Sequence, residues 1–162
     1  MNTATVKTRS LWQLALIDVA LLTAACLIPA ASHLTQVRLF LFNPMMALLL
    51  AGMLLGRDWR NALVLAVLMP VVSCLLTGMP TAAKAVCMAA QLVTIAAMFG
   101  WLKRKWAVLP AVLTAIVAGT TVYYGLKLLL MGVLFSSNSL MLAAASLLWG
   151  LLFAMLYKKV KQ

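Results

Sequence analysis

The sequence predicts an all-α polytopic membrane protein with six transmembrane helices and both termini in the cytoplasm. Of its 162 residues, 66% are apolar and only 9% are charged, and the mean hydropathy is +1.10. Soluble globular domains are close to half apolar and a quarter charged, so this chain belongs to the membrane class. A spanning helix needs about 20 apolar residues, which leaves room for roughly six crossings and little else.

Short polar turns divide the apolar sequence into six predicted helices, which form a single domain over 1–162: 11–30, 39–55, 62–77, 82–102, 108–132 and 140–157. The first of these runs could be mistaken for the apolar part of a signal peptide. It is long for that role, contains Asp18 and has no clean A-x-A cleavage site. We therefore expect it to remain as the first helix.

Each predicted turn contains residues that interrupt a membrane helix. The charged stretch 56–60 ends the second helix, and the Gly-Met-Pro sequence at 78–80 ends the third. Thr81 follows this break and can cap the fourth helix. The basic run 103–105 ends the fourth helix, and the polar stretch 135–139 separates the last two.

Orientation follows from the basic residues, because short loops rich in Lys and Arg stay in the cytoplasm. With six spans, ten of the 13 basic residues fall on one side: Lys7, Arg9, Arg57, Arg60, Lys103, Arg104, Lys105, Lys158, Lys159 and Lys161. Only Arg38 lies in a loop of the other side, while Lys84 and Lys127 fall within or at the ends of helices. Both termini are therefore predicted to be cytoplasmic.

The composition excludes most kinds of enzyme. The only carboxylates are Asp18 and Asp58, and the only imidazole is His33. Paired-carboxylate chemistry, a Ser/His/Asp triad and an HExxH metal site all need more than this. The chain has no phosphate-binding loop, so a partner must supply the energy for any ATP-driven work. We expect no cofactor, no metal site and no nucleic-acid partner. The three cysteines are interpreted as small core residues, and a thiolate ligand for a metal-bearing substrate is the alternative.

Ionisable residues at membrane depth are costly and are default candidates for function. Lys127 lies in the fifth helix on one stripe with Tyr123 or Tyr124, and Lys84 and Gln91 share the outer half of the fourth helix. If these side chains face inward, they line a cationic pocket that suits a small anionic solute. The alternative is that each lysine extends to the outer lipid headgroups.

Four further residues are candidates at or near this pocket. His33 and Arg38, in the predicted first outer loop, could close over it together with Asn43 at the start of the second helix. Trp149 of the sixth helix could stack on a planar ligand ring, although a core or lipid-facing position is equally compatible with the sequence.

Small residues four apart allow membrane helices to approach closely, and Ala20 and Ala24 form such a pair in the first helix. The ALLTA stretch at 20–24, NPM at 43–45 with LAGMLLG at 50–56, and LLTGMP at 75–80 together resemble the substrate-binding S component of an energy-coupling factor (ECF) transporter. This resemblance covers the whole chain and includes the size, the order of features and the cytoplasmic termini.

The resemblance implies a high-affinity subunit of a vitamin or micronutrient importer of the cell inner membrane. Ala20 and Ala24 would dock on a T component, which joins two ABC-type ATPases, and Asn138 would join Lys84, Gln91, Tyr124 and Lys127 in the solute pocket. No motif matches the riboflavin, thiamine, biotin or folate members, so the solute is not assigned. A small membrane scaffold or assembly protein is the alternative, and a proton-coupled transporter is disfavoured because buried carboxylates are scarce.

Overall fold

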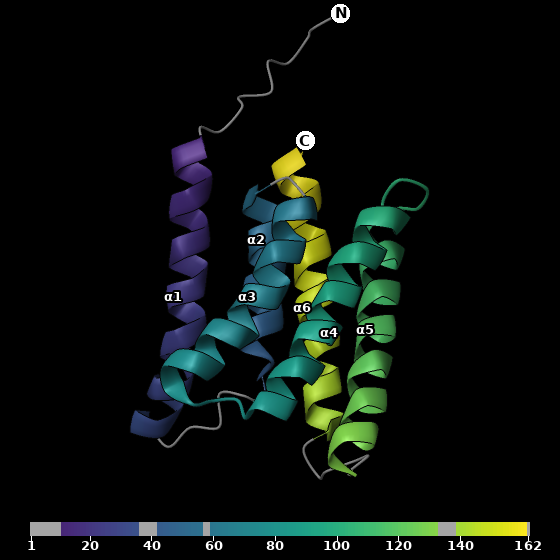
Figure 1. Ribbon diagram of the computed structural model, residues 1–162. Helices are drawn as coiled ribbons and strands as arrows, with labels where there is room; N and C mark the ends of the chain where they lie inside the picture. Colours follow the sequence, from purple (N-terminus) through teal and green to yellow (C-terminus); the bar gives the residue numbers. More distant parts are fainter. Residues whose placement is uncertain (1–10, 36–41, 57–58, 133–138, 162) are drawn as a thin grey trace, which may run out of the picture.

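The structure is a computed structural model that describes residues 11–35, 42–56, 59–132 and 139–161, and these residues form six α-helices and no β-strand. The helices are α1 (Leu11–Thr35), α2 (Pro44–Gly56), α3 (Trp59–Thr77), α4 (Ala82–Leu102), α5 (Val108–Met131) and α6 (Ser139–Lys161). Successive helices run in opposite directions, so the described chain begins and ends at the same end of the bundle (Figure 1). The fold is all-helical, as predicted.

Five of the helices in the described part of the chain, α1, α3, α4, α5 and α6, are long and apolar enough to cross a membrane. Large apolar side chains such as Leu129 and Leu148, which are 80% and 66% exposed, cover the outside of the bundle. A surface of this kind is stable in lipid and not in water. The chain is therefore a multi-pass membrane protein in contact with the bilayer.

Helix α2 is shorter than the other five. It has 13 residues and is thus about 20 Å long at about 1.5 Å per residue, whereas the hydrocarbon core of a bilayer is about 30 Å thick. Its side chains Met46 and Leu49 are fully buried, so α2 lies inside the bundle. The predicted sixth crossing therefore rests on a helix that covers about two thirds of the membrane.

The start predicted for the second helix is wrong where the structure describes it. Residues 39–41 lie outside the described residues, and the helix begins at Pro44. Asn43 has a positive φ of 46°, and this left-handed conformation is incompatible with continuing a right-handed helix. Pro44 then occupies the first helical position, where its missing N–H and fixed φ are tolerated.

The other boundaries differ less from those predicted. Helix α1 continues through Pro29 to Thr35, because membrane helices tolerate proline where neighbouring helices cover the freed backbone groups. Helix α3 begins three residues earlier than predicted, at Trp59, and α6 runs from Ser139 to Lys161 and so extends past 157. Helix α4 has the predicted bounds, and α5 ends one residue early because Gly132 forms a left-handed cap with a φ of 66°.

Among the described residues, the most extensive contact between two helices is that of α4 with α5. Gly119 of α5 lies so close to α4 that an added Cβ would be 2.9 Å from the backbone oxygen of Gln91 and 2.5 Å from Cγ1 of Ile95. Small residues permit this approach in membrane helices, where packing rather than hydrophobic exclusion drives association. The contact fixes the level of α5 relative to α4, which determines how side chains of the two helices meet.

Candidate functional site

A cavity of about 260 Å³ lies between the ends of five helices. It is formed where α2, α4 and α6 begin and where α5 ends, with α1 at its side. This end of the bundle is opposite to the two ends of the described chain (Figure 1). The described residues that line the cavity are Ile28, Asn43, Pro44, Met45, Pro80, Lys84, Met88, Gln91, Tyr123, Tyr124, Lys127, Met131, Ser139 and Leu142.

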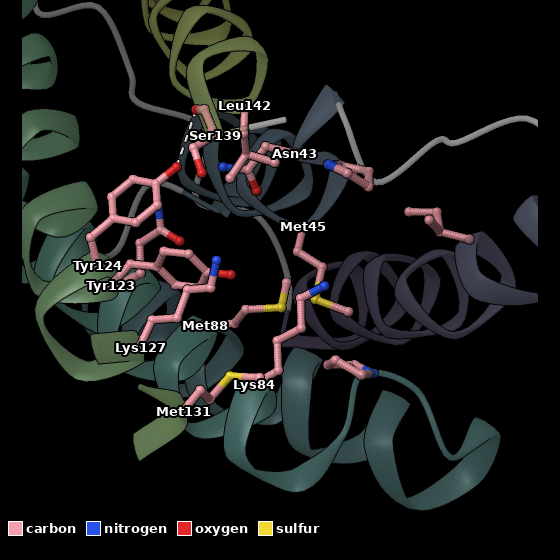
Figure 2. A pocket seen from close by; sticks show the side chains of 14 residues that line it. Asn43, Met45, Lys84, Met88, Tyr123, Tyr124, Lys127, Met131, Ser139 and Leu142 are labelled. Carbon is pink, nitrogen blue, oxygen red and sulfur yellow. Dashed lines mark hydrogen bonds between the residues drawn. The ribbon is translucent and has the colours of Figure 1, made fainter. Parts of the chain in front are cut away.

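Two lysines give the cavity its charge. Lys84 lies in the first turn of α4 and Lys127 near the end of α5, and Figure 2 shows both side chains reaching into the cavity. The Lys127 ammonium is 5.9 Å from the centroid of the Tyr124 ring, within the range of a cation–π interaction. No acidic side chain is among the described residues that line the cavity, so its electrostatic character is cationic.

Helix dipoles add to this positive character. Met45 lies at the N-terminus of α2, Lys84 at that of α4 and Ser139 at that of α6, and all three residues line the cavity. Each helix N-terminus carries a partial positive charge of about half an elementary charge. The C-termini of α1, α3 and α5 lie at the same end of the bundle and offset much of this field. The two lysines therefore remain the main reason why a negatively charged group is favoured in the cavity over a positive one.

Gln91 supplies a hydrogen-bond donor that has no acceptor. The residue is 3% exposed and lines the cavity, and its Nε2 atom is buried with no hydrogen-bond partner. Nearly all buried polar groups in native proteins are paired with protein or ordered water. An orphaned amide beside a cavity therefore has a donor ready for an acceptor inside that cavity.

Two other polar residues of the cavity hold its wall together. The Tyr124 hydroxyl donates to the backbone carbonyl of Ser139 at 3.1 Å, which ties α5 to the start of α6. The Asn43 Nδ2 atom donates to Oγ of Ser146 at 2.9 Å, which ties the start of α2 to α6. These bonds fix the wall around the lysines and Gln91, because they join residues that are far apart in the sequence.

The structure brings five of the predicted site residues to one cavity: Asn43, Lys84, Gln91, Tyr124 and Lys127. Trp149 is not one of the lining residues, and its indole N–H donates to the backbone carbonyl of Phe42 at 2.6 Å. His33 lies in the last turns of α1 and not in a loop as predicted, and its side chain is outside the described part. Arg38 and Asn138 also lie outside the described residues.

The predicted docking pair lies at the periphery of the bundle. Ala20 is exposed and Ala24 half-buried on α1, whose exposed side also carries Leu16 and Val19, 68% and 60% exposed. The Thr23 hydroxyl on this side donates to the Val19 carbonyl at 2.8 Å. The hydroxyl hydrogen is thus bonded within the helix, and this face of α1 is apolar.

Sequence reasoning missed the apolar part of the cavity. Ile28, Met45, Met88, Met131 and Leu142 all line it, and nothing distinguishes them from other apolar residues of apolar helices. Met88 could have been predicted, because it lies four residues after Lys84 and three before Gln91 and so shares their helix face.

Asp18 and the cysteines are the other side chains that could bind an ion. The Asp18 carboxylate accepts hydrogen bonds at both of its oxygens from Nδ2 of Asn61, at 2.9 and 3.0 Å. Within the described residues, no group of three or more His, Cys, Asp or Glu side chains could hold a metal ion. Cys26, Cys74 and Cys87 are free thiols.

No protein-family model, curated protein or solved structure matches this chain. A proposal for the function therefore rests on the geometry of the cavity and on the sequence motifs.

Proposed function

We propose that the protein is the solute-capturing S component of an ECF-type importer in the cell membrane. It has six spans and cytoplasmic termini, binds a small anionic solute from outside, and delivers it through a separate T component and two ABC-type ATPases. It is a transport subunit and not an enzyme. The proposal combines the resemblance at 20–24, 43–56 and 75–80 with the cavity, which is the observation that carries it.

The cavity supports capture of an anion because two lysines line it and no acidic side chain is among its described lining residues. Two ammonium groups in one cavity repel each other, and this repulsion is relieved when an anion binds between them. Isolated charges at membrane depth are kept only where they line a cavity or serve a function. A volume of about 260 Å³ is slightly below the range of about 300–1,000 Å³ for drug-sized ligands, which favours a compact solute.

The distribution of basic residues supports an outward-facing cavity. The described basic residues Arg60, Lys103, Arg104, Lys105, Lys158 and Lys159 lie on the turns and helix ends at the end opposite to the cavity (Figure 1). If that end is cytoplasmic by the positive-inside rule, the cavity opens to the outside, where an importer must collect its solute. Finding tags at the two termini on opposite sides of the membrane would contradict this orientation.

The first helix supports a docking role. Because α1 packs against α2 and α3 on one side only, its face around Ala20 and Ala24 is open to lipid or to another membrane protein. Small residues at four-residue spacing are typical of helix–helix contacts in membranes. The T component would pack on this face.

The test of solute capture is a pair of double variants that remove the same charge from opposite ends. Lys84→Ala with Lys127→Ala removes two ammonium groups from the cavity, and Lys158→Ala with Lys159→Ala removes two from the other end. The proteins are purified in lipid nanodiscs, and small molecules released on denaturation are identified by mass spectrometry. We expect an anion that co-purifies with the wild type and the control but is lost from the cavity variant.

The same experiment distinguishes the scaffold alternative. A membrane scaffold has no need for a solute, so it would yield no specific small molecule in any of the three preparations. Equal amounts of one compound in all three would also contradict the role of the cavity lysines.

A further inference from the structure

The face of α4 that lines the cavity carries three chemically different groups in order. Lys84, Met88 and Gln91 are spaced by four and three residues, so they lie on one face of the helix. From Lys84 to Gln91 the helix rises about 10.5 Å. The face thus presents an ammonium near the mouth, a thioether in the middle and an amide donor at depth.

Helix α5 places its lysine at the same depth in the cavity as the lysine of α4. It runs antiparallel to α4 (Figure 1), and a Cβ added at Gly119 would be 2.9 Å from the backbone oxygen of Gln91. On α4, Lys84 lies seven residues before Gln91, and on α5, Lys127 lies eight residues after Gly119. Because the helices are antiparallel, both steps lead toward the same end of the bundle. The two lysines are therefore at one level, about two turns from the level of Gln91.

The space between these levels is apolar or aromatic. Met88 of α4 and Tyr123 and Tyr124 of α5 lie there, and the two tyrosine rings meet edge to face with centroids 5.3 Å apart. Tyr123 is 6% exposed and closes the deep part with Gln91. A ligand that spans the cavity must therefore be charged at one end and apolar along its length.

We infer that the solute is a compact organic anion that carries a hydrogen-bond acceptor, such as a carbonyl oxygen or ring nitrogen, at the end opposite to its anionic group. The inference rests on the proposed function and names its substrate class. The anionic group lies between Lys84 and Lys127, and the acceptor receives the hydrogen bond of Gln91 Nε2. The cavity volume of about 260 Å³ suits a compact solute of one ring or a short chain.

The acceptor gives selectivity that two lysines alone cannot give. A site with a buried donor discriminates strongly against an analogue that leaves this donor unpaired. Lysine ammonium groups act as point charges and accept any carboxylate or phosphate of suitable size. Gln91 would thus select among anions that the lysines attract.

Matched pairs of probe anions test the inference. Isonicotinate is compared with benzoate, and 4-acetylbenzoate with 4-isopropylbenzoate, because each pair has the same shape and differs in an acceptor opposite the carboxylate. Binding to the protein in nanodiscs is measured by saturation-transfer NMR and competition. We expect the acceptor-bearing member of at least one pair to bind about tenfold or more tightly than its partner, and this preference to disappear in Gln91→Leu.

Two further variants separate loss of the acceptor contact from loss of the fold. Gln91→Met keeps the length of the side chain and should lose the preference as Gln91→Leu does. Thr94→Val removes a hydroxyl of α4 that bonds to Ala90 within the helix and should keep the preference. Equal binding within both pairs, with affinity lost only in the lysine double variant, would overturn the acceptor inference and leave anion capture standing. Absence of binding by all four probes to the wild type would overturn both.

Discussion

Replacement of Gly119 by alanine should destabilise the protein through the contact between α4 and α5. The new Cβ would be 2.5 Å from Cγ1 of Ile95 and 2.9 Å from the backbone oxygen of Gln91, where ordinary contacts are 3.4–4 Å. The Ile95 side chain can rotate, but the Gln91 oxygen moves only with its helix. The helices must therefore separate by about half an ångström or more. Overpacking of this kind costs about 1–3 kcal/mol.

The control for this prediction lies six residues away on the same helix. An added Cβ at Gly125 meets nothing within 4 Å, so Gly125→Ala should be neutral or slightly stabilising through higher helix propensity. The Tm of both variants is measured in the same detergent, with size-exclusion chromatography of the heated samples as the readout of unfolding. At about 2–4 °C per kcal/mol, Gly119→Ala should lower the Tm by roughly 2–12 °C.

A Tm for Gly119→Ala equal to that of Gly125→Ala would refute the reasoning. It would show that α4 and α5 relax without loss and that Gly119 does not set their level. The juxtaposition of Lys84 and Lys127 would then lack its structural basis.

Three further predictions concern contacts away from the α4–α5 contact. Asn43→Ala removes the hydrogen bond to Ser146 and places an alanine at a positive φ, so thermal unfolding should show a loss of about 2–4 kcal/mol, whereas Asn43→Gly should lose less because glycine tolerates that backbone. Asn61→Leu removes the hydrogen bonds that the Asn61 amide donates to the Asp18 carboxylate and should lower the Tm by several degrees, and adding Asp18→Asn should recover part of this loss. Ala20→Glu should abolish co-purification with the T component and solute uptake while probe binding in nanodiscs stays at the wild-type level; intact assembly would contradict docking through α1.

Local chemistry made most of the helices predictable. Gly78 and Pro80 interrupt the chain before α4 whatever surrounds them, so the start of α4 follows from the sequence alone. The start of α2 did not follow, because Leu39 to Phe42 continue an apolar run and the left-handed Asn43 ends it. That conformation accompanies a bond to Ser146, 103 residues away, which no local pattern reveals.

The polar part of the candidate site was predictable and the rest was not. Charged and amide side chains are rare enough in these helices that Lys84, Gln91 and Lys127 could be selected one by one, and their helical spacing placed them on shared faces. The unpaired state of Gln91 depends on what α2 and α6 bring near it. Apolar wall residues such as Met45 and Met131 depend on packing across the bundle, for which a single sequence carries no distance information.

The size of the cavity depends on the length of α2. Helix α2 begins at Pro44, and Pro44 and Met45 form part of the cavity wall. An α2 that began earlier in the sequence would reduce the length of the largest solute that fits, and an α2 that began later would increase that length. A bundle of this design could change its cargo by moving one helix start, with the lysines and the docking helix left in place.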